Sequence, residues 1–369
     1  MAKAMTPKER MLAALALDVP DRLPASVHQW QPYHLAHYLG GISALDAFRR
    51  FGLDAAIVAP VHHSRTGTAQ WRVTSRAHTN EAGNRVTEVR IETPKGTLTQ
   101  LLEADERTEW VVEPIIKHPE DMELVRDYMP TPLLAPEPVA ATYEELGQDG
   151  ILRGFVFGDQ GGPWQHACQL HGTQNMIMAT YDDPDWVHQL LRALTDKKLQ
   201  YVEESLAGLP LDLIETGGGA ASSTVISPTI FREFCLPYDR EIHDALHAVG
   251  HRVVYHTCGG MMPILELIVE NGCDAAETLA PPGVGGDVDA AEVKRRIGQR
   301  VALIGGLDQF NVLTDGSPAQ IRAEVHRLFQ ALGPGGGYII SPSDHFFDTG
   351  EENLHAYARA ARECTYKAE

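Results

Sequence analysis

Residues 252–260 read RVVYHTCGG, and this stretch decides the fold. A short run of β-branched and aromatic residues is followed at once by polar residues and two glycines. A run of this length that ends at glycines is typical of a buried strand that leads into a loop. We predict that it forms one strand of a parallel sheet and that the polar residues lie at its carboxyl end.

Seven similar runs lie along the rest of the chain. Helical patterns or loops that lead to helices follow them, which is typical of βαβ units and a parallel sheet. The runs cover residues 23–28, 55–61, 152–157, 211–215, 273–278, 301–305 and 338–342. With residues 252–256 they make the eight strands that a closed (β/α)8 barrel requires. We therefore predict an α/β protein with a TIM barrel.

Residues 71–101 interrupt this pattern, because apolar and polar residues alternate there around an Asn-Arg and a Lys-Gly turn. This alternation predicts an antiparallel β-hairpin inserted in a loop, and we expect it to cover one mouth of the barrel. The proline-rich residues 129–139 are predicted as an extended connector. The chain is thus interpreted as one domain over residues 1–369. The alternative is two domains that meet near Pro136.

The composition excludes several classes of protein. The chain has 31 Lys and Arg residues against 50 Asp and Glu residues, a net charge of −19. This charge argues against nucleic acid as a partner, because phosphate backbones bind basic surfaces. The sequence contains neither the long apolar run of a membrane helix nor a secretory leader, so we expect a cytoplasmic protein. Five scattered cysteines are interpreted as reduced thiols.

Polar residues stand at the ends of the predicted strands. In this type of barrel the chemistry gathers at the carboxyl ends of the strands. These positions are occupied, in chain order, by His28, His62, His63, Asp159, Glu215, His256, Cys258, Glu277, Asp308, Asp344 and His345. One such residue alone is more often a structural hydrogen-bonding group. The repetition at all eight strands favours an active site.

His256 and Cys258 are the sharpest local signal for a metal. An imidazole and a thiolate two residues apart can face one ion, and this donor pair favours zinc over magnesium or calcium. The alternative is a buried cysteine beside a histidine that caps a helix. Glu277, Asp344 and His345 are the candidates for further ligands. The sequence leaves open whether Asp344 or His345 binds the metal.

Two other histidines, His243 and His247, lie four residues apart on the helix predicted after Tyr238. This spacing can hold a metal ion. A helix of this kind belongs to the outer ring of the barrel, however, and we expect both histidines on a solvated helix face.

Several short motifs together resemble the uroporphyrinogen decarboxylase superfamily, and the resemblance covers nearly the whole chain. Its members fold as (β/α)8 barrels, which agrees with the eight predicted strands. The motifs are Thr6–Arg10 (TPKER), Pro20–Arg22 (PDR), Ile226–Pro228 with Phe231 and Pro237-Tyr238, His256–Gly259 (HTCG), Gly286–Asp289 (GDVD), Ile304–Asp308 (IGGLD) and Glu352-Asn353.

The resemblance implies one of two activities. Uroporphyrinogen decarboxylases carry an arginine-rich segment of the form RQAGRY soon after the first strand, and residues 28–34 (HQWQPYH) contain no arginine. The HTCG motif instead resembles the zinc-dependent methyltransferases that work with corrinoid proteins, with His256 and Cys258 as two zinc ligands. Those enzymes usually add a second cysteine near the last strand, where this chain has Ser343, Asp344 and His345. We expect such a zinc site to favour an oxygen substrate such as a methyl ether.

The resemblance therefore implies methyl transfer, or O-demethylation, between a small molecule and a corrinoid (cobalamin) carried by a separate protein, because no corrinoid-binding motif was found. A homodimer is compatible with this prediction. Glu215, His28 and Asp308 are the candidate catalytic or orienting residues. The candidate substrate-binding residues are His62, His63, Asp159 and Trp30. The alternatives are a decarboxylase-like lyase that uses no corrinoid and a binding module without turnover.

Overall fold

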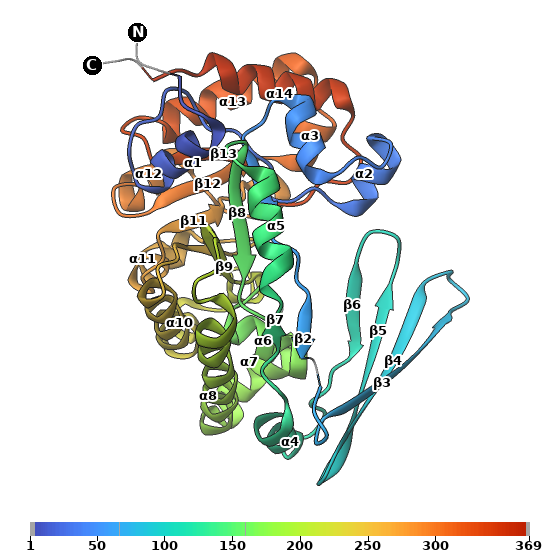
Figure 1. Ribbon diagram of the computed structural model, residues 1–369. Helices are drawn as coiled ribbons and strands as arrows, with labels where there is room; N and C mark the ends of the chain where they lie inside the picture. Colours follow the sequence, from blue (N-terminus) through green and yellow to red (C-terminus); the bar gives the residue numbers. More distant parts are fainter. Residues whose placement is uncertain (1–3, 66, 159, 367–369) are drawn as a thin grey trace.

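The computed structural model describes residues 4–65, 67–158 and 160–366 (Figure 1). Seven parallel strands form one curved sheet in the order β1-β8-β9-β10-β11-β12-β13. Each strand falls within or overlaps a predicted run, so the predicted parallel sheet is confirmed. The strands are β1 (Ala55–Val58), β8 (Gly150–Phe155), β9 (Leu213–Gly217), β10 (Val253–His256), β11 (Ala275–Thr278), β12 (Ala302–Leu307) and β13 (Tyr338–Pro342).

The eighth predicted run, at residues 23–28, closes the curved sheet. Ala25 forms a parallel bridge with Ile340 of β13, and its carbonyl accepts a hydrogen bond of 2.8 Å from the backbone N–H of Asp54, next to β1. The segment therefore lies between the first and last strands of the sheet. Pro24 has no N–H to donate, which limits regular pairing here. The barrel is thus closed by an irregular eighth member.

A buried ion-pair network anchors this closing segment. The carboxylate of Asp54, which is fully buried, accepts hydrogen bonds from Arg10 (2.5 Å), from Arg22 (3.0 Å) and from the backbone N–H of Ala25 (2.9 Å). Arg10 also binds Asp21 at 2.6 Å. Arg10 and Arg22 belong to the TPKER and PDR motifs, so these motifs fix the closure of the barrel.

Helices surround the sheet (Figure 1). Many begin at a residue whose side chain accepts a backbone N–H, such as Thr6, Ser43 and Ser317, and several have proline in the first turn. In the described residues, no helix is long and apolar enough to cross a membrane. The α-helices are α1 (Pro7–Leu15), α2 (Pro32–Tyr38), α3 (Ala44–Phe51), α4 (Asp121–Tyr128), α5 (Pro136–Leu146), α6 (Pro163–His171), α7 (Thr173–Asp182), α8 (Pro184–Tyr201), α9 (Pro228–Ile230), α10 (Leu236–Ala248), α11 (Leu265–Glu270), α12 (Ala290–Ile297), α13 (Pro318–Leu332) and α14 (Glu351–Glu363).

Short 3-10 and π segments extend or link these helices at η1 (Val202–Leu206), η2 (Gly219–Ala221), η3 (Phe231–Cys235), η4 (Met262–Ile264), η5 (Pro282–Val284) and η6 (Gln309–Thr314). The proline-rich connector is shorter than predicted. It contains the two-residue strand β7 (Leu133–Leu134), and α5 begins at Pro136. Proline in the first turn of a helix is compatible with helix formation, because the first N–H groups have no partner in the helix.

Helix α10 is more buried than predicted. His243 is fully buried, and its ring nitrogens contact the hydroxyl of Thr216 at 2.7 Å and the carbonyl of Asn271 at 2.9 Å. His247 is exposed and pairs with Asp274. The prediction of a solvated face is therefore confirmed for His247 and wrong for His243, because the His243 side of α10 packs on the sheet.

The inserted segment is larger than the predicted hairpin. It forms an antiparallel sheet of four strands beside the barrel (Figure 1). The two predicted turns are confirmed, and the additional strand follows a third turn. The strands are β3 (Arg72–Thr79), β4 (Arg85–Thr93), β5 (Gly96–Ala104) and β6 (Glu109–Glu113). Strand β2 (His63–Arg65), which pairs with β7, precedes this sheet.

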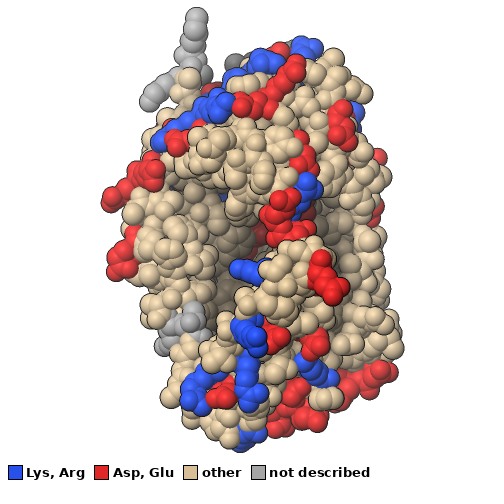
Figure 2. All heavy atoms as spheres, turned by 90° about the vertical axis from the view of Figure 1, so that its right-hand side faces the viewer, with Lys and Arg blue, Asp and Glu red and all other residues tan. Residues whose placement is uncertain are grey.

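The inserted sheet contacts the barrel at both ends. Its apolar residues Ile91 and Leu98 belong to the main hydrophobic core. At the other end, the turn between β5 and β6 carries Arg107, which hydrogen bonds to Asp348 (3.2 Å) and lies over the ring of Tyr33 (4.8 Å). Figure 2 shows a hollow on the face of the molecule that carries this sheet. The sheet therefore borders the open side of the molecule and contacts α2 and the loop after β13.

Candidate active site

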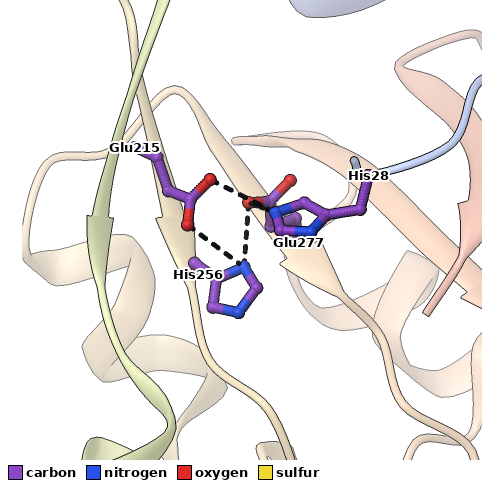
Figure 3. Close-up of side chains that lie close together, drawn as sticks. All are labelled: His28, Glu215, His256 and Glu277. Atoms are coloured by element: carbon purple, nitrogen blue, oxygen red, sulfur yellow. Dashed lines mark hydrogen bonds and ion pairs between the residues drawn. The ribbon is translucent and has the colours of Figure 1, made fainter. Parts of the chain in front are cut away.

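Four side chains meet at the carboxyl ends of the strands: His28, Glu215, His256 and Glu277 (Figure 3). The last three come from the neighbouring strands β9, β10 and β11, and His28 follows the closing segment. His256 and Glu277 are partners in the register of the sheet, and Nδ1 of His256 lies 3.0 Å from Oε1 of Glu277. On the other side, Nε2 of His28 lies 3.2 Å from Oε2 of Glu215. We call these four residues the inner cluster.

Arg153 of β8 supplies positive charge to the inner cluster. Its Nη2 atom donates hydrogen bonds of 2.7 Å to both Glu215 and Glu277. Sequence reasoning missed this residue because it lies inside a strand rather than at its end. The available signal was an arginine in the otherwise apolar run ILRGF at residues 151–155.

The inner cluster is charged although it is buried. Burial opposes ionisation of Glu277, but Arg153 and His28 overcome it and hold the pKa of Glu277 well below its ordinary value. Burial also favours a neutral His28, yet Glu277 and Glu215 raise its pKa. The network therefore carries its charges as compensated pairs.

Cys258 and Asp344 extend the cluster toward the open side. Sγ of Cys258 lies 3.0 Å from Nε2 of His256 and 2.9 Å from Oδ2 of Asp344. The predicted meeting of the His256 and Cys258 side chains is thus confirmed. The loop is held in place because Thr224 accepts the N–H of Gly260 (2.7 Å) and Asp287 accepts that of Met261 (2.7 Å). We call His256, Cys258 and Asp344 the outer triad.

Asp344 and His345 have different surroundings, although both lie near the site. Asp344 contacts the thiol of Cys258, whereas Nε2 of His345 lies 3.3 Å from Nδ1 of His28. Burial and the charge of His28 lower the pKa of His345 to about 4. Burial opposes ionisation of Asp344, but His256 and His345 lower its pKa. Asp344 is therefore the better ligand for an ion that also binds Cys258.

The donors of the outer triad fit zinc. Thiolate sulfur, imidazole nitrogen and carboxylate oxygen are the ligand types of zinc sites, and these three atoms lie within 4.8 Å of one another. Glu277 contacts Nδ1 of His256, so the Nε2 lone pair is free to face Cys258, as in other carboxylate–histidine–zinc arrangements. The inner cluster also has donors within this distance. Its two carboxylates, however, are already bound by Arg153.

Two predicted residues lie outside these clusters. Asp308, at the end of β12, accepts the backbone N–H groups of Phe310 (3.0 Å) and Asn311 (2.7 Å) and so caps η6. Trp30 is 4% exposed and packs among aromatic rings, including that of Phe51. The structure therefore does not bring Asp308 and Trp30 to the candidate metal ligands, and their roles in catalysis and substrate binding stay predictions.

The remaining predicted residues are placed as follows. His62 is exposed, and His63 lies at the start of β2 and lines a separate pocket beside Phe157. Neither contributes a donor to the inner cluster or the outer triad. Asp159 lies outside the described residues. The roles of His62, His63 and Asp159 in substrate binding stay predictions.

Comparison with known proteins identifies the family. Residues 101–364 match the family described as Uroporphyrinogen decarboxylase (URO-D). The chain belongs to this family. A uroporphyrinogen decarboxylase of Shewanella loihica is 31% identical over 216 residues, which cover 55% of this chain and 56% of the relative. One of Coxiella burnetii is 28% identical over 234 residues, with coverages of 58% and 59%.

The alignments thus span little more than half the length of these decarboxylases. A solved structure of a methyltransferase from Methanosarcina mazei matches over 97% of this chain and 99% of its own, with a TM-score of 0.66 and 20% identity. This likeness shows that the present chain shares the fold of that protein over nearly all of the given sequence.

Proposed function

We propose that this URO-D family member is a zinc-dependent methyltransferase that moves a methyl group between a small molecule and a corrinoid protein. The contact of the Cys258 thiol with both His256 and Asp344 carries this proposal, because it supplies three zinc donors at the open side of the barrel. The fold shared with a methyltransferase supports it.

In the proposed reaction, the bond between the methyl carbon and the substrate oxygen breaks. The methyl group passes without its bonding electrons to the reduced cobalt of a corrinoid on a partner protein, and the electron pair stays on the oxygen. A bound zinc ion would act as a Lewis acid that stabilises this negative charge. Three protein ligands leave the ion one place for substrate.

The surrounding residues orient the ligands and hold a proton. Glu277 accepts the Nδ1 proton of His256, which fixes the ring with Nε2 toward Cys258. His28, between Glu215 and His345, donates its Nδ1 proton toward Nε2 of His345. These contacts would give the proposed site a proton donor close to Asp344 of the outer triad.

Metal analysis tests the first half of this proposal. Purified protein should contain one zinc ion per chain, and Cys258→Ala should abolish its binding. The matched control is Cys273→Ala, because Cys273 is a buried thiol just before β11, at the opposite end of that strand from Glu277. Loss of zinc from both variants, or no zinc in the unaltered protein, would contradict the proposed ligand set.

A spectroscopic assay tests the second half. Mixing the protein with a reduced corrinoid protein and a methoxylated compound should change the corrinoid absorbance, and Cys258→Ala should remove the change. The decarboxylase relatives favour a second candidate, a lyase that needs no corrinoid. Decarboxylation of a porphyrinogen by corrinoid-free protein, with no corrinoid response to methoxy compounds, would support the lyase instead.

A further inference from the structure

A second pocket lies between the inserted sheet and the barrel. It has a volume of about 360 Å³ and is bordered on one side by β3 and β4 and on the other by α6 and the end of β8. Its size is that of a small-molecule site. None of the described residues that line it carries a permanent charge. The apolar side chains that line it include Trp71, Ile91, Ile115, Met129, Phe157 and Leu170.

Two imidazole nitrogens at this pocket have no hydrogen-bond partner. They are Nε2 of His63 and Nδ1 of His166, and both atoms are buried. His166 is 5% exposed. A buried polar atom without a partner is unfavourable, because it has lost its hydrogen bonds to water. A ligand with a hydroxyl or ether oxygen would satisfy these atoms.

The backbone at Gly158 packs closely against one of these nitrogens. Gly158 has φ +91°, and a Cβ atom at this position would lie 2.7 Å from Nδ1 of His166. Glycine is thus required both by the conformation and by the space beside the imidazole. A side chain at this position would displace the imidazole of His166 or Nζ of Lys198, which lies 2.9 Å from the same point.

Both histidines are neutral, and this favours an uncharged ligand. Burial lowers the pKa of His63. Burial, together with the charge of Lys198, places the pKa of His166 well below its ordinary value. A neutral imidazole both donates and accepts a hydrogen bond. The aromatic and thioether side chains that line the pocket pack well against the face or edge of an aromatic ring.

The same loop that borders this pocket reaches the outer triad. After Gly158, the side chain of Gln160 accepts the N–H of Gly219 at 3.0 Å, and a Cβ atom on Gly219 would lie 3.6 Å from Cβ of Cys258. The loop after β8 therefore contacts the glycine turn that covers the zinc-binding thiol. The pocket and the metal site lie on the same side of the barrel.

We propose that this pocket binds an uncharged aromatic compound that carries hydroxyl or methoxy groups, with His63 and His166 as hydrogen-bonding partners. This compound would be the methyl donor or its demethylated product, an assignment that rests on the proposed function. The binding itself does not depend on zinc or on a corrinoid.

Calorimetric titration with 2-methoxyphenol tests the proposal. Saturable binding is expected, and His166→Leu should weaken it about three- to tenfold, the effect of one hydrogen bond. Binding of toluene, which has no oxygen, should change little in the same variant. Equal loss for both ligands would indicate collapse of the pocket and would overturn the hydrogen-bonding role.

A filling variant provides a second test that leaves His166 intact. Val73 lines the pocket from β3 and is 50% exposed, so Val73→Phe should fold and reduce the affinity for 2-methoxyphenol at least about tenfold. The matched control is Val112→Phe on β6, which is 45% exposed and lies outside this pocket. Equal affinity in the two variants would place the ligand elsewhere and overturn the proposal.

Cys258→Ala separates this inference from the proposed function. It should lose zinc and methyl transfer but retain the binding of 2-methoxyphenol. If Val73→Phe weakens the binding of 2-methoxyphenol as expected but the unaltered protein transfers no methyl group, the aromatic site is supported and the proposed transferase function is rejected. If 2-methoxyphenol binds equally well to Val73→Phe and Val112→Phe and both variants transfer methyl groups, the transferase stands and this aromatic site is rejected.

Discussion

Buried polar groups are charged on one face of strand β10 and neutral on the other. His256 faces the barrel interior and joins the inner cluster, where Arg153 and two glutamates carry compensating charges. Its neighbour Tyr255 lies against α10, beside His243. There, burial lowers the pKa of His243 to about 4 and raises that of Asp239 to about 7. Successive residues of a strand point to opposite faces, so one strand serves both environments.

The difference teaches that burial alone does not define a reactive site. In the inner cluster, specific opposite charges favour the ionised forms of Glu277 and His28 despite their burial. On the outer face, which we define by Asp239, His243 and Tyr255, burial dominates and favours neutral forms. The predictions below separate these two environments by their effects on stability and metal binding.

Arg153→Met should give the largest effect. It leaves Glu215 and Glu277 buried without their shared cation, which should lower the free energy of unfolding by about 3–5 kcal/mol. Urea denaturation measures the change. The control is Arg192→Met, which breaks an exposed pair with Glu241 and should cost at most about 1 kcal/mol. Equal losses in the two variants would show that the inner cluster is not held by charge compensation.

Asp239→Asn should stabilise the protein at a pH above 7. Burial raises the pKa of Asp239 from 3.8 to about 7 in the folded chain. As the pH rises through this range the unfolded chain ionises first, so stability falls between these values and the loss is complete above pH 7. The shift of about three units corresponds to at most about 4 kcal/mol.

The stabilisation by Asp239→Asn should disappear as the pH falls toward 4. Thermal unfolding at several pH values measures this dependence. Asp196→Asn, on the exposed side of α8, provides the comparison and should lack the pH-dependent gain. A gain at Asp239 that is the same at every pH would mean that ionisation of this carboxyl is not its cause.

Glu277→Gln should weaken zinc binding without removing a direct ligand of the outer triad. The carboxylate orients His256 through Nδ1, and loss of such a contact typically costs about 10–100-fold in metal affinity. Competition with a chromogenic chelator measures the affinity. Glu324→Gln, which breaks an exposed pair with Arg327, should leave it unchanged. Unchanged affinity in Glu277→Gln would argue against this role of Glu277.

Thr216→Val should give the smallest effect. On β9, Thr216 faces the outer side and contacts Nε2 of His243, whereas its neighbour Glu215 faces the inner cluster. Loss of this neutral hydrogen bond should cost about 1 kcal/mol and leave zinc affinity unchanged. The control is Thr195→Val, whose hydroxyl bonds to a carbonyl of its own helix and should matter less. Loss of zinc in Thr216→Val would show that the two faces are coupled.

The barrel could be predicted from the sequence because its strands form from short apolar runs, and polar candidate residues stand at the ends of these runs. His256, Cys258, Glu277 and Asp344 were all identified as candidates from their places at or just after the ends of strands. Arg153 was missed because a strand's pattern alone does not reveal which buried residue faces the interior.

Other features of the structure have local causes that the strand pattern hides. Asp308 follows a strand but also precedes a helical turn, and the structure uses its carboxylate as a cap. The burial of His243 depends on how α10 packs against the sheet, which its own four-residue spacing does not specify. Local patterns therefore locate strand ends better than they assign the direction of each side chain.

The closing segment makes the site dependent on both ends of the described chain. Ala25 pairs with Ile340, and Leu23 donates its N–H to the carbonyl of Cys364 at 2.8 Å. During synthesis on the ribosome, His28 is made well before its neighbour His345 and the strand that braces Ala25. A nascent chain that lacks them contains the thiol and imidazole of the HTCG turn without their final enclosure. Activity is thus expected to appear only after the segment around His345 has left the ribosome.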